Sequence, residues 1–199
     1  MVKLHLACGP VYLKGWINID AKGEPADKRP DLVKINSTTI KNYYKHSYVR
    51  KAFGHNKRGK IVVDIKCNVL NLPFEWDSVD EILSVNLINH LRFQDFPKMI
   101  EEWYRVLKSG GTLIIDVDDI LGHAKLLVEA KTKEEYEWIM RCIFCHSRDK
   151  YDHHFWGYTP IYLKQLLKEF NFKHVWTRRD FIKHVYPSFK ICFQKYEKK

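Results

Sequence analysis

The chain has 199 residues, of which 45% are hydrophobic and 29% are charged. This composition is typical of one globular domain that is long enough to bury a core. No apolar run has the length of a membrane span, and the apolar patch at the N-terminus is too short for a secretory signal. We therefore expect a single domain over residues 1–199, starting at Met1 and located in the cytoplasm.

The chain is basic, with a formal net charge of +10 at pH 7. Its basic residues gather in 41–60 and from Lys164 to the end. Such a charge allows an anionic partner, including nucleic acid. No motif of nucleic-acid recognition accompanies it, so nucleic acid stays a possible but secondary partner.

Runs of β-branched and aromatic residues bounded by turn signals predict strands in chain order. They lie at 2–7, 16–19, 60–67, 81–85, 112–117, 174–178 and 188–194. Helical periodicity predicts helices over 94–107, 133–146 and 160–170. The first should end at "KSGG" with a glycine cap, and Thr159 with Pro160 should start the third. Alternating strands and helices indicate an α/β sandwich with a largely parallel sheet.

Residues 21–59 depart from this alternation. The segment is polar, basic and rich in tyrosine. A stretch of this length inside a compact domain is usually functional, so we predict a lid or insertion with one short helix.

The first strand ends in a small-residue turn, "LACGP", and the next run ends at Asp20. Ligands of open α/β sheets bind outside the carboxyl ends of the strands. Small residues let the backbone approach a ligand there. An acid at the end of the second strand is placed to accept hydrogen bonds from both hydroxyls of a ribose.

Four ordered blocks resemble the class I S-adenosylmethionine-dependent methyltransferases, in their small predicted-methyltransferase branch. They are "LHLACG" with "GWINID", "NVLNLPFEWDSVDEIL", "INHLRFQDFPKMIEEWYRVLKSGG" and "YDHHFWGYTP". The resemblance covers nearly the whole chain outside 21–59. It implies a Rossmann-like sandwich whose mostly parallel seven-stranded sheet ends in an antiparallel C-terminal hairpin.

The resemblance also implies a cofactor, S-adenosyl-L-methionine, and the residues that bind it. The turn would wrap the amino-acid part, Asp20 would hold the ribose, and Asn86 would approach the methionine part. Asn68 and the amide of Val69 would meet the adenine. The turn consists of Leu6, Ala7, Cys8, Gly9 and Pro10.

Several positions depart from the family pattern. Ala7 replaces the first glycine of the turn, and His5 replaces an asparagine. Asn68 replaces an aspartate, which removes charge assistance worth on the order of 1 kcal/mol. Asn89 replaces the glutamate of L-E-H. Ala7, Asn68 and Asn89 favour a silent methyltransferase-like binding module, whereas Asp20 and the intact "GWINID" block argue against it.

The candidate catalytic residues are His90 and His154. His90 either acts as a general base or caps a loop, and His154 either lines the acceptor site or packs in an aromatic hinge. Asp118 and Asp119 end the fifth strand and either meet the acceptor or cap the next helix. Cys8 is expected to be a packing residue, because nothing near it in sequence would activate its thiol.

The five cysteines are expected to be free thiols. "CIFCH", residues 142–146, fits the pattern of covalent haem attachment, which requires export, so we attribute the match to coincidence. Cys142, Cys145 and His146 with His153 and His154 also form a conceivable zinc set. The family does not imply one, and we predict no metal.

Together these features predict a methyltransferase whose acceptor is a small molecule, a nucleotide sugar or a glycan. A nucleic-acid methyltransferase and a silent binding module are the alternatives. Neither the acceptor nor the oligomeric state follows from the sequence.

Overall fold

The computed structural model describes residues 1–43, 59–147, 149–179 and 186–197. Most of the second half of the predicted lid, residues 44–58, therefore lies outside the described residues. Within the described ranges, none of the helices has the length and apolar character needed to cross a membrane.

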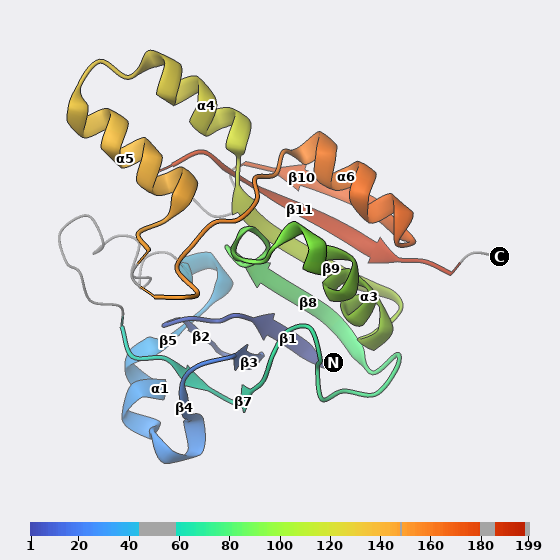
Figure 1. The fold of residues 1–199 in the computed structure, drawn as a ribbon. Helices are drawn as coiled ribbons and strands as arrows, with labels where there is room; N and C mark the ends of the chain where they lie inside the picture. The colour runs from blue at the N-terminus through green and yellow to red at the C-terminus, as the bar shows by residue number, and fades with distance from the viewer. Residues whose placement is uncertain (44–58, 148, 180–185, 198–199) are drawn as a thin grey trace.

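A seven-stranded sheet forms the centre, in the order β10-β11-β9-β8-β1-β3-β7 (Figure 1). Its five strands β1, β3, β7, β8 and β9 are parallel, and β11 runs antiparallel to both β9 and β10. This confirms the predicted fold class. The strands are β1 (Lys3–Leu6), β3 (Ile17–Asp20), β7 (Ile65–Lys66), β8 (Val79–Val85), β9 (Leu107–Asp118), β10 (Phe172–Arg178) and β11 (Ser188–Lys195).

Helices and short strand pairs surround the sheet. The helices are α1 (Pro30–Asn36), α3 (Phe96–Val106), α4 (Ile120–Glu129), α5 (Lys133–Phe144) and α6 (Pro160–Glu169). The short strands β2 (Tyr12–Leu13) and β5 (Ser37–Thr38) pair, as do β4 (Glu24–Pro25) and β6 (Val62–Val63). Short 3-10 helices cover Ala26–Lys28, Ile40–Asn42, Ile88–His90 and Phe93–Asp95.

The helix predictions are partly right. Thr159 caps α6 as predicted, by accepting a hydrogen bond from the amide of Tyr162. The predicted end of α3 at "KSGG" is wrong, because Leu107 is already extended and "KSGG" lies inside β9. Helix α4 was not among the predicted helices. The strand predicted at 60–67 is two short strands separated at Asp64.

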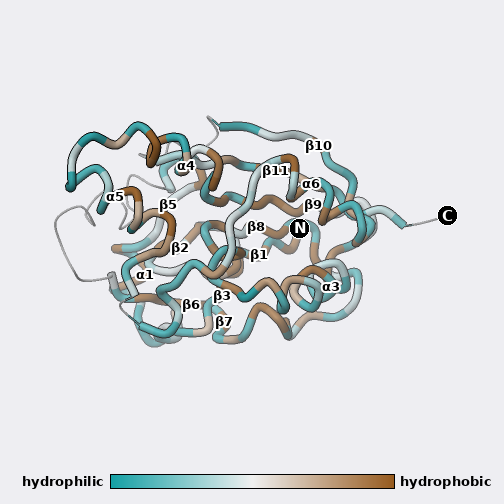
Figure 2. The backbone as a smooth tube through the Cα atoms, turned by 45° about the horizontal axis from the view of Figure 1, so that its top comes forward, coloured by the Kyte–Doolittle hydropathy of each residue, from teal (hydrophilic) through white to brown (hydrophobic). Residues whose placement is uncertain are grey.

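Alternate residues of the central strands fill two separate cores. Ile82 of β8, Ile115 of β9 and Ile191 of β11 pack with α3 and α6 on one face. Leu83, Ile114 and Cys192 face the other side, against Val11, Leu13 and Tyr43. This is the two-residue period of a sheet buried on both faces. Figure 2 shows the hydrophobic colour concentrated along these strands.

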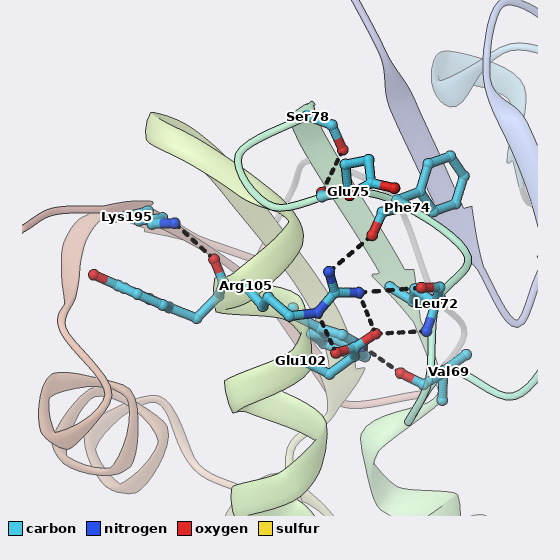
Figure 3. A network of polar contacts seen from close by, with 10 residues as sticks. Val69, Leu72, Phe74, Glu75, Ser78, Glu102, Arg105 and Lys195 are labelled. Atoms are coloured by element: carbon cyan, nitrogen blue, oxygen red, sulfur yellow. Dashed lines mark hydrogen bonds and ion pairs between the residues drawn. The ribbon is translucent and has the colours of Figure 1, made fainter.

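Three side chains near the C-terminal end of helix α3 hold the connection between β7 and β8 (Figure 3). The Trp103 indole donates to the carbonyl of Val69 at 3.1 Å, and the Leu72 amide donates to Glu102 at 2.6 Å. Arg105 donates to the carbonyls of Leu72 and Phe74 and to both carboxylate oxygens of Glu102. The connection is thus tied to the helix through its backbone, and its Val69 and Leu72 side chains pack into the core.

The turn after β1 contains a non-glycine residue in the left-handed region. Ala7 has φ +50° and Gly9 has φ +53°. Left-handed backbone costs an alanine about 1 kcal/mol relative to glycine, because its Cβ crowds the following carbonyl. The chain therefore carries strain at the turn where the family has glycine.

We predict that Arg105→Lys lowers the free energy of unfolding by about 2 kcal/mol. A lysine keeps the charge but cannot reproduce the forked donation to two carbonyls and a carboxylate. Chemical denaturation measures the change. Arg141→Lys is the control, because Arg141 lies 3.7 Å from Glu137 in a pair that is about half exposed, and it should change stability by less than about 0.5 kcal/mol. Equal effects of the two substitutions would contradict this account.

We predict that Ala7→Gly raises the free energy of unfolding by about 1 kcal/mol, because glycine adopts a positive φ without strain. The melting temperature and a denaturant titration report the change. Ala21→Gly, at an exposed position outside the left-handed region, should leave stability unchanged or lower it. A fall in stability in Ala7→Gly would show that the turn is not strained.

Candidate active site

The parallel strands bring four chain segments to one edge of the sheet. Leu6 at the end of β1 pairs with Ile19 of β3 on one side and with Ser84 of β8 on the other. Asn86, just beyond β8, donates its amide to the carbonyl of Asp116 in β9. The turn 6–10, Asp20, Asn86 and the end of β9 therefore lie along one carboxyl edge, where open α/β sheets bind ligands.

Asp20 lies directly against the turn. One oxygen of its carboxylate accepts a hydrogen bond from the Gly9 amide at 3.0 Å, and the other accepts one from the Lys22 amide at 3.0 Å. A carboxylate oxygen can accept more than one hydrogen bond, so both oxygens keep capacity for a ligand. A Cβ built on Gly9 would meet no atom of the described residues within 4 Å, so the turn borders space that these residues leave open.

Cys8 is a packing residue, as predicted. Its side chain is buried, and its thiol is near the carbonyls of Gly9 and Val62. Burial raises the pKa of the Cys8 thiol well above its usual value, and the nearby Asp20 and Asp64 raise it further. A thiol with a raised pKa is a poor nucleophile.

Asn68 and Val69 follow β7, which pairs with β3 through Asp20 and Lys66. The Asn68 side chain is exposed, and its oxygen accepts a hydrogen bond from the Leu70 amide at 3.0 Å. Val69 is buried and is fixed through its carbonyl by Trp103. Asn68 and Val69 therefore follow the strand that neighbours Asp20 at the carboxyl edge of the sheet.

Asn86 has a left-handed backbone, with φ +48°. Its side-chain nitrogen donates to the hydroxyl of Tyr186 at 2.9 Å. Its side-chain oxygen is buried and has no hydrogen-bond partner among the described residues. Buried polar atoms are nearly always paired, so an unpaired acceptor at this edge indicates a place for a donor from a ligand.

Residues 145–147 and 149–158, here called the cover segment, lie across this edge. The Phe155 amide donates to the carbonyl of Asn89 at 2.7 Å, and Tyr158 forms an isolated bridge with Asp119. Lys22, two residues after Asp20, forms an ion pair with Asp149 at 2.9 Å. The cover segment therefore touches the residues that follow β3, β8 and β9 (Figure 1).

The two candidate catalytic histidines lie together. The rings of His90 and His154 are 4.5 Å apart between centroids, in an edge-to-face arrangement. His90 comes from the 3-10 helix after β8, and His154 comes from the cover segment. Burial, and secondarily His90, lowers the pKa of His154 to about 3, so this ring is neutral at neutral pH.

The acids at the end of β9 have different surroundings. Asp118 accepts a hydrogen bond from the Asn89 side chain at 3.3 Å, and burial followed by Asp116 raises its pKa well above the usual value. Asp119 forms an ion pair with Arg179 at 2.6 Å. The side chain of Asp119 makes no capping hydrogen bond to α4, so the capping alternative does not hold.

One site residue was missed from the sequence. Asn18, the asparagine of "GWINID", is buried and holds the loop before β3 by hydrogen bonds to both the amide and the carbonyl of Leu13. Its oxygen is also 3.0 Å from Nδ1 of His5, whose Nε2 is 2.8 Å from the hydroxyl of Tyr43. Burial lowers the pKa of His5 to about 4. The motif could have indicated this role, since an asparagine can pair with both polar groups of the backbone.

A family model described as a methyltransferase domain matches residues 35–115. A comparison with proteins of curated function finds no match.

Solved structures with this fold include several methyltransferases. A SAM-dependent methyltransferase from Methanosarcina mazei has 17% sequence identity and a TM-score of 0.57, over 98% of this chain and 92% of the other. A putative S-adenosylmethionine-dependent methyltransferase from Listeria monocytogenes has 15% identity and a TM-score of 0.55, over 98% and 90%.

A third structure is the 1,6-didemethyltoxoflavin-N1-methyltransferase from Burkholderia thailandensis, solved with 1,6-didemethyltoxoflavin and S-adenosylhomocysteine. It has 14% identity and a TM-score of 0.58, over 98% of this chain and 71% of the other. At these identities the likeness concerns the fold. The family model thus matches 81 of the 199 residues, and the solved structures show that this chain has the fold of S-adenosylmethionine-dependent methyltransferases.

Proposed function

We propose that this protein is a methyltransferase that transfers a methyl group from S-adenosylmethionine to a small-molecule or glycan acceptor at the carboxyl edge of the sheet. The observation that carries the proposal is the Asp20 carboxylate, held against the Gly9 amide at the end of the turn. A ribose bound there would find both carboxylate oxygens able to accept from its hydroxyls.

The other residues at the edge fit the remaining parts of this cofactor. The turn from Leu6 to Pro10 borders open space and would hold the amino-acid part. The unpaired oxygen of Asn86 suits a donor such as an ammonium group. Asn68 and Val69 would meet the adenine.

When bound, the cofactor supplies an electrophilic methyl group, so the protein has mainly to bring the acceptor into line with it. We assign this task to the cover segment with His90 and His154. Asp118, close to His154 at 3.7 Å, adds a carboxyl group to the same place. A base is needed only where the acceptor gives up a proton late in the transfer.

Among the described residues, a basic hollow lies away from the proposed cofactor position, which favours a small acceptor over nucleic acid at that hollow. A hollow of about 510 Å³ is lined by Lys164, Lys168 and Lys173 with Tyr196, on α6, β10 and the residues after β11. Because β10 is the far edge of the sheet from β3, this basic hollow does not border the proposed cofactor position. Nucleic acid bound at the hollow would lie away from the methyl donor.

The alternative of a silent module rests on Ala7, Asn68 and Asn89. The third departure is balanced in the structure, because the Asn89 side chain donates to the Asp118 carboxyl group at 3.3 Å. A carboxyl group is thus present beside position 89, supplied by β9 instead of the loop after β8.

We predict that Asp20→Asn weakens S-adenosylhomocysteine binding at least tenfold. The amide keeps the shape and one acceptor but loses the charge that strengthens two hydrogen bonds to the ribose. Isothermal titration calorimetry measures the affinity. Asp27→Asn, an exposed acid in a 3-10 helix, is the matched control and should bind as wild type does.

Two results would contradict this proposal. Wild-type protein with an intact circular dichroism spectrum and no measurable binding would favour the silent module. Unchanged affinity in Asp20→Asn would place the ribose elsewhere.

We predict that Asn68→Asp tightens S-adenosylhomocysteine binding several-fold. The exposed side chain already accepts a hydrogen bond from Leu70, and a carboxylate adds charge assistance worth about 1 kcal/mol toward the adenine amino group. The same titration measures the affinity. Asn71→Asp, at an exposed neighbouring position, is the control and should not change the affinity. An equal gain in affinity in both variants would show that the gain comes from the added net charge and not from a contact with the adenine.

A further inference from the structure

Three possible metal ligands meet beside the candidate active site. One ligand atom each from His90, Cys145 and His154 lies within 4.8 Å of the other two. They come from separate places: the 3-10 helix after β8, the residue after α5, and the cover segment. Ligand atoms around a tetrahedral zinc ion are roughly 3.5 Å apart, so small side-chain rotations would close the set.

Hydrogen bonds to backbone carbonyls fix the tautomer of both histidines. Nδ1 of His90 lies 3.0 Å from the carbonyl oxygen of His153. Nδ1 of His154 lies 3.1 Å and 3.2 Å from the carbonyl oxygens of Cys142 and Ile143. A carbonyl oxygen only accepts, so Nδ1 carries the proton in both rings and the lone pair is on Nε2. Metal-binding histidines are usually oriented by such a second hydrogen bond.

The backbone of Cys145 is in a region that almost only glycine adopts. Its φ is +65° and its ψ is −165°. Non-glycine residues in this region are found mainly where function requires the side chain to be in one place. The thiol at the C-terminal end of α5 is therefore held by a backbone conformation that is unfavourable for cysteine.

The charges near the thiol suit a divalent ion. The Cys145 sulfur is 3.1 Å from a carboxylate oxygen of the fully buried Asp152. Cys145, His146 and Asp152 form a second set of ligand atoms within 4.8 Å. A thiolate and a carboxylate together bring two negative charges, which a divalent cation balances.

We propose that His90, Cys145 and His154 bind a zinc-class divalent ion, with Asp152 beside the thiolate. Two histidines and a cysteine leave a fourth position open, as in catalytic zinc sites. This inference deepens the proposed function, on which its role rests: an ion at this place would bind an acceptor oxygen or nitrogen next to the methyl donor.

The site differs from the zinc set considered from the sequence. Cys145 and His154 belong to both. The thiol of Cys142 belongs to neither set of adjacent ligand atoms, and its carbonyl instead orients His154. His153 contributes its carbonyl to His90, and its ring lies 3.2 Å from the hydroxyl of Ser147.

The test is metal binding by the full chain. Cobalt(II) titrated into protein treated with chelator and reductant should give a tetrahedral spectrum with a thiolate charge-transfer band at about one ion per chain. Zinc should displace it. Cys145→Ser should abolish the charge-transfer band, and His154→Gln should weaken cobalt binding at least tenfold. Cys67→Ser and His174→Gln, outside both ligand sets, are the controls and should bind as wild type does.

Cys145→Gly separates loss of the site from loss of the fold. Glycine relieves the backbone strain, so this variant should melt at a higher temperature than the metal-free wild type while binding no cobalt. Wild type without a thiolate–cobalt band, or an unchanged band in Cys145→Ser, would overturn the proposal. Each variant is also titrated with S-adenosylhomocysteine, so failure of the metal site is distinguished from failure of the cofactor site.

Discussion

The clamp between α3 and the β7–β8 connection is the constraint on which the candidate site depends. Trp103, Glu102 and Arg105 hold this connection through backbone groups of Val69, Leu72 and Phe74. The same helix packs its apolar side on β8 and β9. Because α3 is fixed to the sheet, the clamp fixes Asn68 and Val69 relative to Asp20. One buried tryptophan and a partly exposed ion pair thereby determine the geometry of a surface edge.

Much of this fold was predictable because its signals are local. Strand composition and the order of elements indicated the parallel sheet, and Thr159 with Pro160 indicated the start of α6. The end of α3 was misplaced because a Lys–Ser–Gly–Gly sequence resembles a helix cap. Here it begins β9 instead, since Lys195 reaches across to the carbonyls of Tyr104 and Leu107. That contact joins residues about ninety positions apart, which no local pattern reports.

The candidate site divides in the same way. The turn and Asp20 could be placed from the sequence, because they lie at the ends of the first two predicted strands, which are expected to be neighbours in the sheet. The sequence could not predict that His90 lies close to Cys145 and His154. Their proximity depends on the path of the cover segment over the end of β8. The contact between Asn89 and Asp118 was also hidden. Asn89 alone looked like the loss of a carboxyl group, but the Asp118 carboxyl group lies 3.3 Å from its side chain.

Most of the strained backbone lies at this carboxyl edge. Among the described residues, six non-glycine residues have positive φ: Ala7, Asn86, Cys145 and Ser147 at or over the edge, and Asp77 and Asn171 away from it. Left-handed backbone costs non-glycine residues free energy, and a single change to glycine would recover it at Ala7 or Cys145. A fold kept only as a scaffold has no reason to retain such costs at one edge. A fold that positions a cofactor, an acceptor and a metal ligand there does, because side chains held by strained backbone are held in one place. The distribution of strain therefore favours a working site over a silent one.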